Sequence, residues 1–543
     1  MSNGLYSFPK SAAIEPVDQF STVYVEADGN VNPGELLTLQ EMGLVSKSNG
    51  IVDLATVENN NSSTAIAVKA ATTLVNNGAS TYFTLATEES NVTLQNGNVA
   101  LLYSGNGSSS ATTRLNLTIH NINGNTINDV IVDSGASISA MRIKALSNGN
   151  ALLCWRLSSA LYYAIYSPYG IQVVAPTVVH ATTTLTSTVP CEVLSTGDFI
   201  IAYDKSNVGL YFKRYNVSGV AQGTEVTVES ASVRDYPVIS PLENGGFVLS
   251  YKTSTVYGYR RYSSVGVATG SFVTVGIVFE ISMRPHERVV ELSNNNIAIL
   301  GINTSDTKPN VVIYNASDTL VNTVIVGGSS VSGGSKAAIC KTPLGFGVVY
   351  HGAFGVSVNL YCKFYDTVGN VLSPEITSAY HSGTAYTTLF GLYAKATATG
   401  ITIVNFATIG ANYEIVIYSI TYAGQVVSSR LAVYSSASSI STLSITPVGA
   451  GIFHLFWRLT AGAEGVAYAV AKAGRSSILG VAQKYTPSGS LVPVATKGSF
   501  TLPSSQTMMN GRAFNARTNA VPGNRGMVSG RAVLLLGLDS ERV

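Results

Sequence analysis

Short apolar runs alternate with small polar turns along most of the chain. Residues 198–203 (DFIIAY), 210–215 and 224–228 are three such runs, and a turn at Gly219 separates the last two. Runs of this length, rich in β-branched and aromatic residues, are typical of β-strands. No helical 3.6-residue periodicity and no capping box accompanies them. The pattern predicts an all-β fold.

One turn signature repeats along the chain and sets the expected architecture. An aromatic or apolar residue is followed four positions later by Gly or Asp. The pairs are His120/Gly124, Tyr166/Gly170, Tyr215/Gly219, Tyr262/Gly266, Tyr314/Asp318, Tyr365/Gly369, Ile420/Gly424 and Val470/Gly474. Their spacing of about fifty residues lies in the range of propellers and arrays, and it is about twice what a solenoid coil needs. Each repeat is therefore interpreted as one propeller blade.

A second signature lies about twenty residues before most of these pairs, at a spacing that fits the same repeat. It is a Leu followed by a small polar turn, as in Leu94–Gly97, Leu146–Gly149, Leu194–Gly197, Leu242–Gly245 and Leu292–Asn295. Asn-Gly sequences supply the positive φ angles of a two-residue hairpin turn. With an apolar stretch before each Leu, every repeat has room for four antiparallel strands.

The number of blades depends on how the ring closes. The last repeat, residues 449–474, has three recognisable strands. An open end would leave an unpaired strand edge, so a propeller must close. Residues 63–75 alternate in strand fashion and offer the missing outer strand. We expect eight blades of four strands, with seven blades as the alternative.

The two ends of the chain are expected to form a second, small β-domain. Residues 23–27 and 32–39 surround a Pro-Gly turn, and residues 478–482 and 488–494 are strand-like at the other end. The predicted organisation is an N-terminal half of this domain at 1–50, a link with the closing strand at 51–79, the propeller at 80–474, and the C-terminal half at 475–543.

The terminal pieces resemble a known family. The opening G-x-L-x-x-L at 34–39 and the closing L-G-V-A at 479–482 with G-x-L-V-x-V-x-x-x-G at 489–498 resemble small β-domains of tailed-bacteriophage virion proteins. This similarity covers residues 20–50 and 475–502. It implies a tail-attached or capsid-attached protein of the virion, anchored by the terminal domain on other virion proteins, in several copies per particle. The inserted propeller would project outward.

Composition agrees with this setting. Only 11% of residues are charged, 46% are hydrophobic and the formal net charge is +2, which argues against nucleic acid or anionic membrane as a partner. The first residues lack the charged start and apolar core of a secretory signal, and no apolar stretch is long enough to span a membrane. A neutral polar surface suits life outside a cell. A virion protein assembled in the host cytoplasm and released by lysis would reach the outside of the cell without a secretory signal.

The sequence offers little catalytic or metal-binding chemistry. Cys154, Cys191, Cys340 and Cys362 are widely spaced and are interpreted as buried apolar residues; the six histidines are scattered. No Asp-box of the sialidase type and no G-x-S-x-G elbow is present. The candidate acids for glycoside hydrolysis, which needs a close carboxylate pair, are Asp198, Asp204, Asp235, Glu243 and Glu280. We expect no enzyme, no cofactor and no metal.

Tyrosine is the positive signal for binding. The chain has 29 Tyr against 2 Trp, and Tyr and Arg are favoured at recognition surfaces. The candidate ligand-binding residues are Tyr169, Tyr257, Arg260 and Arg261. Tyrosine is also a good strand residue, so a purely structural role is the alternative.

The C-terminal segment is basic. Residues 497–531 contain no acid and include Arg512, Arg517, Arg525 and Arg531, which are predicted to dock the chain onto a neighbouring subunit. A solvated loop is the alternative. The hypothesis is thus a bacteriophage structural protein that displays a propeller for host-surface binding, to a glycan or protein, or for particle decoration. A carbohydrate-active propeller enzyme and a purely architectural tail or connector protein are the alternatives.

Overall fold

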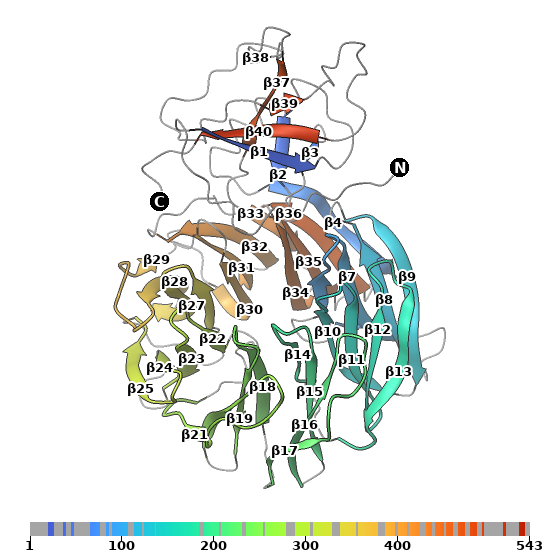
Figure 1. Ribbon diagram of the computed structural model, residues 1–543, viewed down its shortest axis with the longest axis vertical. Coiled ribbons are helices and arrows are strands. Elements are labelled where there is room, and N and C mark those ends of the chain that lie inside the picture. The colour runs from blue at the N-terminus through green and yellow to red at the C-terminus, as the bar shows by residue number, and fades with distance from the viewer. Residues whose placement is uncertain are drawn as a thin grey trace. The chain divides into compact units, whose positions relative to one another are not determined.

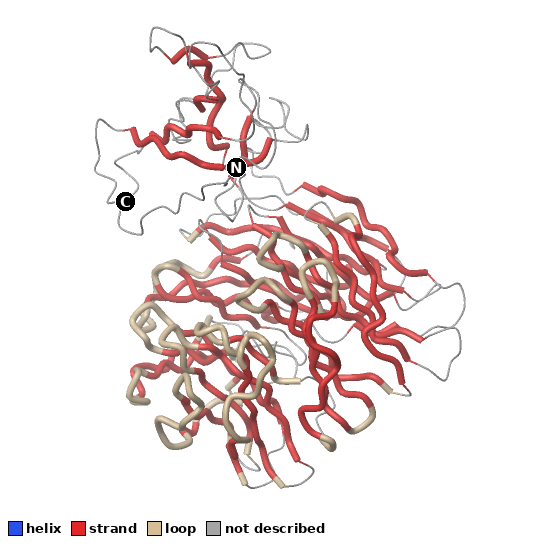
Figure 2. Tube along the Cα trace, turned by 45° about the vertical axis from the view of Figure 1, so that its right-hand side comes forward, coloured by secondary structure: helices blue, strands red, loops and turns tan. Residues whose placement is uncertain are grey.

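The computed structural model divides the chain into two compact units, residues 64–474 and residues 1–63 with 475–543. It describes most of residues 90–377, with gaps at 107–112, 122–123, 136, 184–188, 206–207, 231–234, 254–255, 279–287, 304–307, 328–336 and 355–356. Outside that range it describes the strands named below and Tyr422. Every regular element in the described residues is a β-strand (Figure 2). None of them contains a helix that could cross a membrane.

The larger unit is an eight-bladed propeller (Figure 1). Blade 1 contains β5 (Phe83–Leu85), β6 (Asn91–Thr93), β7 (Val99–Asn106), β8 (Thr113–His120) and β9 (Thr126–Gly135). Blade 2 contains β10 (Ile138–Ala145), β11 (Ala151–Leu157), β12 (Ala160–Tyr166) and β13 (Gln172–His180). Blade 3 contains β14 (Cys191–Val193), β15 (Phe199–Lys205), β16 (Gly209–Tyr215) and β17 (Val226–Glu229). Blade 4 contains β18 (Asp235–Pro241), β19 (Phe247–Lys252), β20 (Tyr257–Tyr262) and β21 (Val273–Thr274).

The second half of the ring has the same antiparallel order. Blade 5 contains β22 (Val289–Glu291), β23 (Ile297–Ile302), β24 (Pro309–Tyr314) and β25 (Leu320–Ile325). Blade 6 contains β26 (Ala337–Thr342), β27 (Gly345–Phe354), β28 (Ser357–Asp366) and β29 (Ile376–Thr377). Blade 7 contains β30 (Tyr386–Ala396), β31 (Gly400–Ile409), β32 (Asn412–Thr421) and β33 (Leu431–Ser436). Blade 8 contains β34 (Ile440–Gly449), β35 (Ile452–Leu459), β36 (Gly465–Lys472) and β4 (Ile66–Asn76).

Blade 8 closes the ring with strands from both ends of the propeller sequence. β4 pairs antiparallel with β36, so that Ile66 lies opposite Lys472 and Asn76 opposite Gly465. The Tyr468 hydroxyl of this blade donates to the Gly124 carbonyl of blade 1. The eight-bladed prediction is confirmed, and β4 takes the place of the outer strand that the last repeat lacks. It belongs to the propeller unit and not to a separate link.

The repeated Gly and Asp positions form equivalent turns between the third and fourth strands of the blades. Their φ angles are positive: 80° at Gly124, 78° at Gly170, 83° at Gly219, 84° at Gly266, 61° at Asp318 and 91° at Gly369. Glycine adopts this conformation without steric cost. The expected equivalence is confirmed for these six blades, whereas Gly424 and Gly474 lie outside the described residues.

The Leu-initiated turns between first and second strands differ from the expected two-residue type. In blade 1 the Leu94 N–H donates to Asn98 O (2.8 Å) and the Gly97 N–H donates to Leu94 O (2.9 Å). Only the last turn residue has a positive φ, such as 81° at Gly97 and 63° at Asn295. This is a three-residue loop, in which a type I turn is followed by one left-handed residue. The preceding Asn instead accepts a backbone N–H two residues ahead, as Asn96 does from Asn98.

Antiparallel order places these two sets of turns on one face of the propeller. The first strand of a blade runs toward this face and the third strand also runs toward it. We name it the turn face. The opposite side, which carries the hairpins between second and third strands and the connections between blades, is named the link face.

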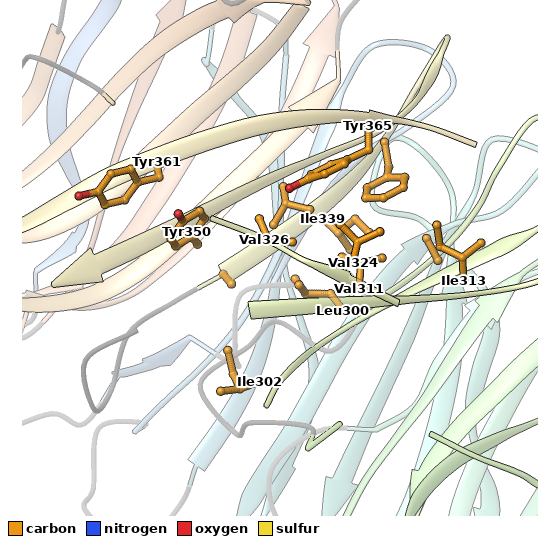
Figure 3. Packing of buried hydrophobic residues seen from close by; sticks show 14 of the residues in the cluster. Leu300, Ile302, Val311, Ile313, Val324, Val326, Ile339, Tyr350, Tyr361 and Tyr365 are labelled. Atoms are coloured by element: carbon orange, nitrogen blue, oxygen red, sulfur yellow. The ribbon is translucent and has the colours of Figure 1, made fainter. Parts of the chain in front are cut away.

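The apolar core lies between successive blades. Between blades 5 and 6, Leu300, Val311 and Ile313 pack with Ile339, Tyr350 and Tyr365 (Figure 3). Alternate side chains of each strand point to opposite neighbours, so every blade contributes to two clusters. All four cysteines are buried and none of them forms a disulfide, as expected of small apolar residues.

The smaller unit is a sheet built from both ends of the chain. It contains β1 (Phe20–Glu26), β2 (Leu36–Leu39), β3 (Val45–Lys47), β37 (Ile478–Tyr485), β38 (Leu491–Pro493), β39 (Phe514–Ala516) and β40 (Arg531–Gly537). The order is β1-β40-β39-β37-β2-β3, with β38 paired to β37. N-terminal β1 and β2 thus pair with C-terminal β40 and β37. The propeller is inserted in a β-domain that both termini form.

Candidate functional site

A polar pocket opens on the turn face between blades 4 and 5. Its volume is about 320 Å³. The two turns of blade 4 line one side, and the corresponding turns of blade 5 line the other. The lining residues are Leu242, Asn244, Gly246, Arg261, Tyr262, Ser263, Ser264, Thr269, Glu291, Asn295 and Ala316. We name this site the interblade pocket.

Arg261 is fixed in the wall of the pocket by contacts to blade 5. Its side chain is 7% exposed, and Nε donates to Asp318 Oδ1 at 2.6 Å. One Nη atom donates to the Asn315 carbonyl at 2.9 Å, and the Tyr259 hydroxyl donates to the same Asp318 oxygen at 2.9 Å. Hydrogen bonds to charged groups are stronger than neutral ones. The guanidinium therefore links two blades and leaves little uncompensated positive charge in the pocket.

Glu291 supplies a carboxylate at the end of the first strand of blade 5. It accepts a hydrogen bond from the backbone N–H of Glu243 in blade 4. Burial raises the pKa of Glu291 above its usual value, and the nearby Glu243 carboxylate acts in the same direction. The hydrogen bond from Glu243 and the cations Lys341 and Arg261 oppose this rise. Lys341 of blade 6 itself forms an ion pair with Glu243.

Neutral polar groups complete the pocket. Asn244 uses Oδ1 to accept the Gly246 N–H at 2.9 Å, and within the described residues its Nδ2 has no protein acceptor. The same holds for the side chains of Asn295, Ser264 and Thr269, which form no hydrogen bond with other described groups. Ser263 Oγ accepts the Val267 N–H at 3.2 Å. The pocket therefore offers several amides and hydroxyls to a ligand.

The predicted binding residues are not brought together. Tyr169 is 58% exposed in a turn of blade 2 on the turn face. Tyr257 begins β20 and is half-buried at the link face, with Lys252 Nζ 5.1 Å from its ring centre. Arg260 points away from the pocket, and its Nη1 donates to the Val228 carbonyl of blade 3 at 2.7 Å. Of the four candidates, only Arg261 lines the interblade pocket.

The acids that were candidates for hydrolysis are also scattered. Asp198 pairs with Arg214 at 3.3 Å, and Asp204 accepts from the Thr183 hydroxyl. Glu243 pairs with Lys341 beside the pocket. Asp235 begins β18, and Glu280 lies outside the described residues. Within the described part of the chain, no cluster of three His, Cys, Asp or Glu side chains is suited to a metal ion.

The predicted docking arginines fall where the structure gives no side-chain detail. Arg512, Arg517 and Arg525 lie outside the described residues. Arg531 begins β40, where its backbone position is opposite Glu26 of β1. The docking prediction is therefore untested.

Glu291, Asn244, Ser263 and Ser264 were missed by reasoning from the sequence. The available signal was the repeat itself, because Asn244 lies in one recurring turn and Ser263 and Ser264 lie in the other. Placing the two turn families on the same face of adjacent blades brings these residues together. Glu291 directly precedes Leu292, which begins the corresponding turn of blade 5, so the repeat also places Glu291 beside these turns.

Comparisons with known proteins extend to the fold only. No protein-family model and no curated protein sequence matches the chain. Similar solved structures include a Dyadobacter fermentans protein of unknown function (10% identity, TM-score 0.36, 75% of this chain and 99% of that one). Another is the propeller domain of the trilobed protease of Pyrococcus furiosus (10% identity, TM-score 0.39, 65% of this chain and 97% of that one). A third is a polysaccharide lyase of family PL25, an ulvan lyase (11% identity, TM-score 0.39, 68% of this chain and 98% of that one).

Proposed function

We propose that this chain is a non-enzymatic structural and binding protein of a bacteriophage particle. The terminal unit attaches it to other virion proteins, and the propeller is displayed for host-surface binding or particle decoration. The observation that carries the proposal is the pairing of β1 with β40 and of β2 with β37. A domain completed only when both ends of the chain meet presents everything between them as a single insertion. Such an arrangement suits an anchor with a displayed module.

Binding is favoured over catalysis by the way the propeller uses its acids. Asp318, Glu192 and Glu225 form ion pairs with Arg261, Lys144 and Lys205. A general acid or base needs a pKa near the working pH and must lie within hydrogen-bond reach of the atom to or from which it transfers a proton. Carboxylates paired with cations within a blade or between blades are suited to a structural role rather than to proton transfer.

A carbohydrate-active enzyme is the second candidate, and Glu291 is the observation in its favour. Its pKa is raised by burial, and Glu243 lies beside it. Two nearby carboxyl groups are the usual requirement for glycoside hydrolysis. The Glu243 carboxylate forms an ion pair with Lys341. This pairing weakens the enzyme alternative, because it leaves Glu291 without a free carboxylate partner. Glycan turnover by the purified chain that disappears in Glu291→Gln would establish the enzyme instead.

Attachment is tested on purified particles from the producing host. We expect the wild-type chain to sediment with the particles, and the triple variant Arg512→Ala, Arg517→Ala and Arg525→Ala to be lost from them while its propeller stays folded. The matched control replaces the same three residues with Lys, which keeps the charge. Charge-mediated docking should also weaken as salt screens the contacts.

Two results would change the proposal. Incorporation of the Ala variant at the wild-type level would assign docking to the terminal β-sheet and make the basic segment a passive loop. Absence of the wild-type chain from every particle fraction would overturn the virion assignment.

A further inference from the structure

We infer that the interblade pocket binds one uncharged saccharide unit of a larger glycan. This inference deepens the binding role proposed above and rests on it. The pocket volume of about 320 Å³ lies at the small end of the usual range for ligand sites. It suits one sugar ring of a chain whose remainder lies in solvent.

The charges of the pocket point to a neutral ligand. Arg261 is neutralised by Asp318 at 2.6 Å, so it does not offer a free cation to a carboxylate or sulfate. The Glu291 carboxylate in the pocket wall would repel an anionic group placed there. The cations near the pocket, Arg261 and Lys341, are paired with Asp318 and Glu243, and an uncharged ligand leaves both ion pairs undisturbed.

The available hydrogen-bonding groups match hydroxyls. A sugar hydroxyl both donates and accepts, as do the Ser264 and Thr269 hydroxyls and the Asn295 amide. Asn244 keeps Nδ2 available as a donor because its Oδ1 is engaged by Gly246. The Glu291 carboxylate is a strong acceptor for a hydroxyl proton. Donors and acceptors thus surround the same small volume.

The pocket is also held in shape before a ligand arrives. Asn244 and Asn295 lie in the three-residue turns, where a left-handed residue fixes the backbone. Arg261 ties the two walls together through Asp318 and Asn315. A preorganised site loses less entropy on binding. Each site is nevertheless expected to bind weakly, and several copies on one particle would supply avidity.

Saturation-transfer NMR on the purified full-length chain tests the inference. The probes are the neutral hexoses glucose, galactose and mannose, with N-acetylneuraminic acid and glucosamine as charged comparators. At least one neutral hexose should bind, and the charged sugars should bind less. Asn244→Ala and, separately, Ser264→Ala should weaken that binding roughly threefold to tenfold, as expected for the loss of one or two hydrogen bonds.

Asn148→Ala is the matched control. Asn148 has the same place in the blade 2 turn, and its Oδ1 accepts the Asn150 N–H at 3.2 Å, as Asn244 does from Gly246. Both variants lose the same turn contact, but Asn148 does not line the pocket, so its sugar binding should stay at the wild-type level. Circular dichroism identifies any variant that fails to fold. Ser264→Ala is a second test that leaves the contact between Asn244 and the Gly246 N–H intact.

The inference is wrong if no neutral hexose binds, if a charged sugar is preferred, or if Asn244→Ala and Ser264→Ala bind like the wild type. This measurement uses no particle. Failure here with particle incorporation intact would leave the virion proposal standing, whereas sugar binding without incorporation would overturn the virion proposal alone.

Discussion

At the residue scale, Asp318 shows how one position can serve both backbone and side chain. It occupies the turn position that glycine holds in the other five described repeats, with a φ of 61°. Asp tolerates this conformation better than most residues. In return its carboxylate accepts hydrogen bonds from Arg261 and Tyr259 of the preceding blade. The exception to the repeat is therefore a link between blades 4 and 5.

Replacing Asp318 with Gly, the residue of the other repeats, should destabilise the protein. The turn geometry is kept, but Arg261 and Tyr259 lose a shared acceptor in a largely buried place. Removing one partner of a buried ion pair costs about 3–5 kcal/mol, and we expect a loss near the lower end of that range in urea denaturation.

Asn295→Gly is the control for this change. Asn295 also has a positive φ, of 63°, but it carries no such ion pair, so the change in unfolding free energy should stay within about 1 kcal/mol. A stability of Asp318→Gly equal to that of Asn295→Gly would show that the ion pair contributes nothing.

Glu225 gives the propeller a pH-dependent contact in blade 3. Burial alone would raise its pKa, but hydrogen bonds from Lys205 and Tyr203 outweigh this and lower the pKa below the usual value. A lowered carboxyl pKa stabilises the fold above the unfolded-state pKa, and this contribution is lost as pH falls through the folded-state value.

The variant Glu225→Gln should thus be less stable than the wild type at pH 7. The difference should be under about 1 kcal/mol because the pair is partly exposed. It should vanish as the pH is lowered below about 4, the ordinary range for Glu. Thermal unfolding from pH 7 to pH 3 measures this, and a difference that is constant over the range would contradict the assignment.

At the element scale, the sequence predicted the strands and repeats better than the site. Gly170 and Gly219 marked the turns correctly because only a left-handed residue fits there. The Leu94–Gly97 type of turn is one residue longer than the two-residue turn that Asn-Gly predicts, because Asn-Gly also fits a three-residue loop. The pocket could not be predicted from one repeat, because Glu291 and Asn244 meet only when adjacent blades are packed in register.

The closing strand makes a clear prediction at this scale. A chain of residues 64–474 keeps β4 and should fold as a closed ring. A chain of residues 77–474 lacks β4 and exposes the edge of β36 along its whole length, and exposed edges promote association. The shorter chain should aggregate or form dimers in size-exclusion chromatography. A monomeric, equally stable shorter chain would show that β4 is dispensable.

At the scale of the whole molecule, the two units are joined by two covalent connections at one place. β4 begins at Ile66 and β36 ends at Lys472, and these residues are partners in the sheet of blade 8. A pull on the terminal unit would reach the ring through both strands of this pair at the same end. A protease that cuts one connection would leave the propeller held by the other, so release requires two separate cuts.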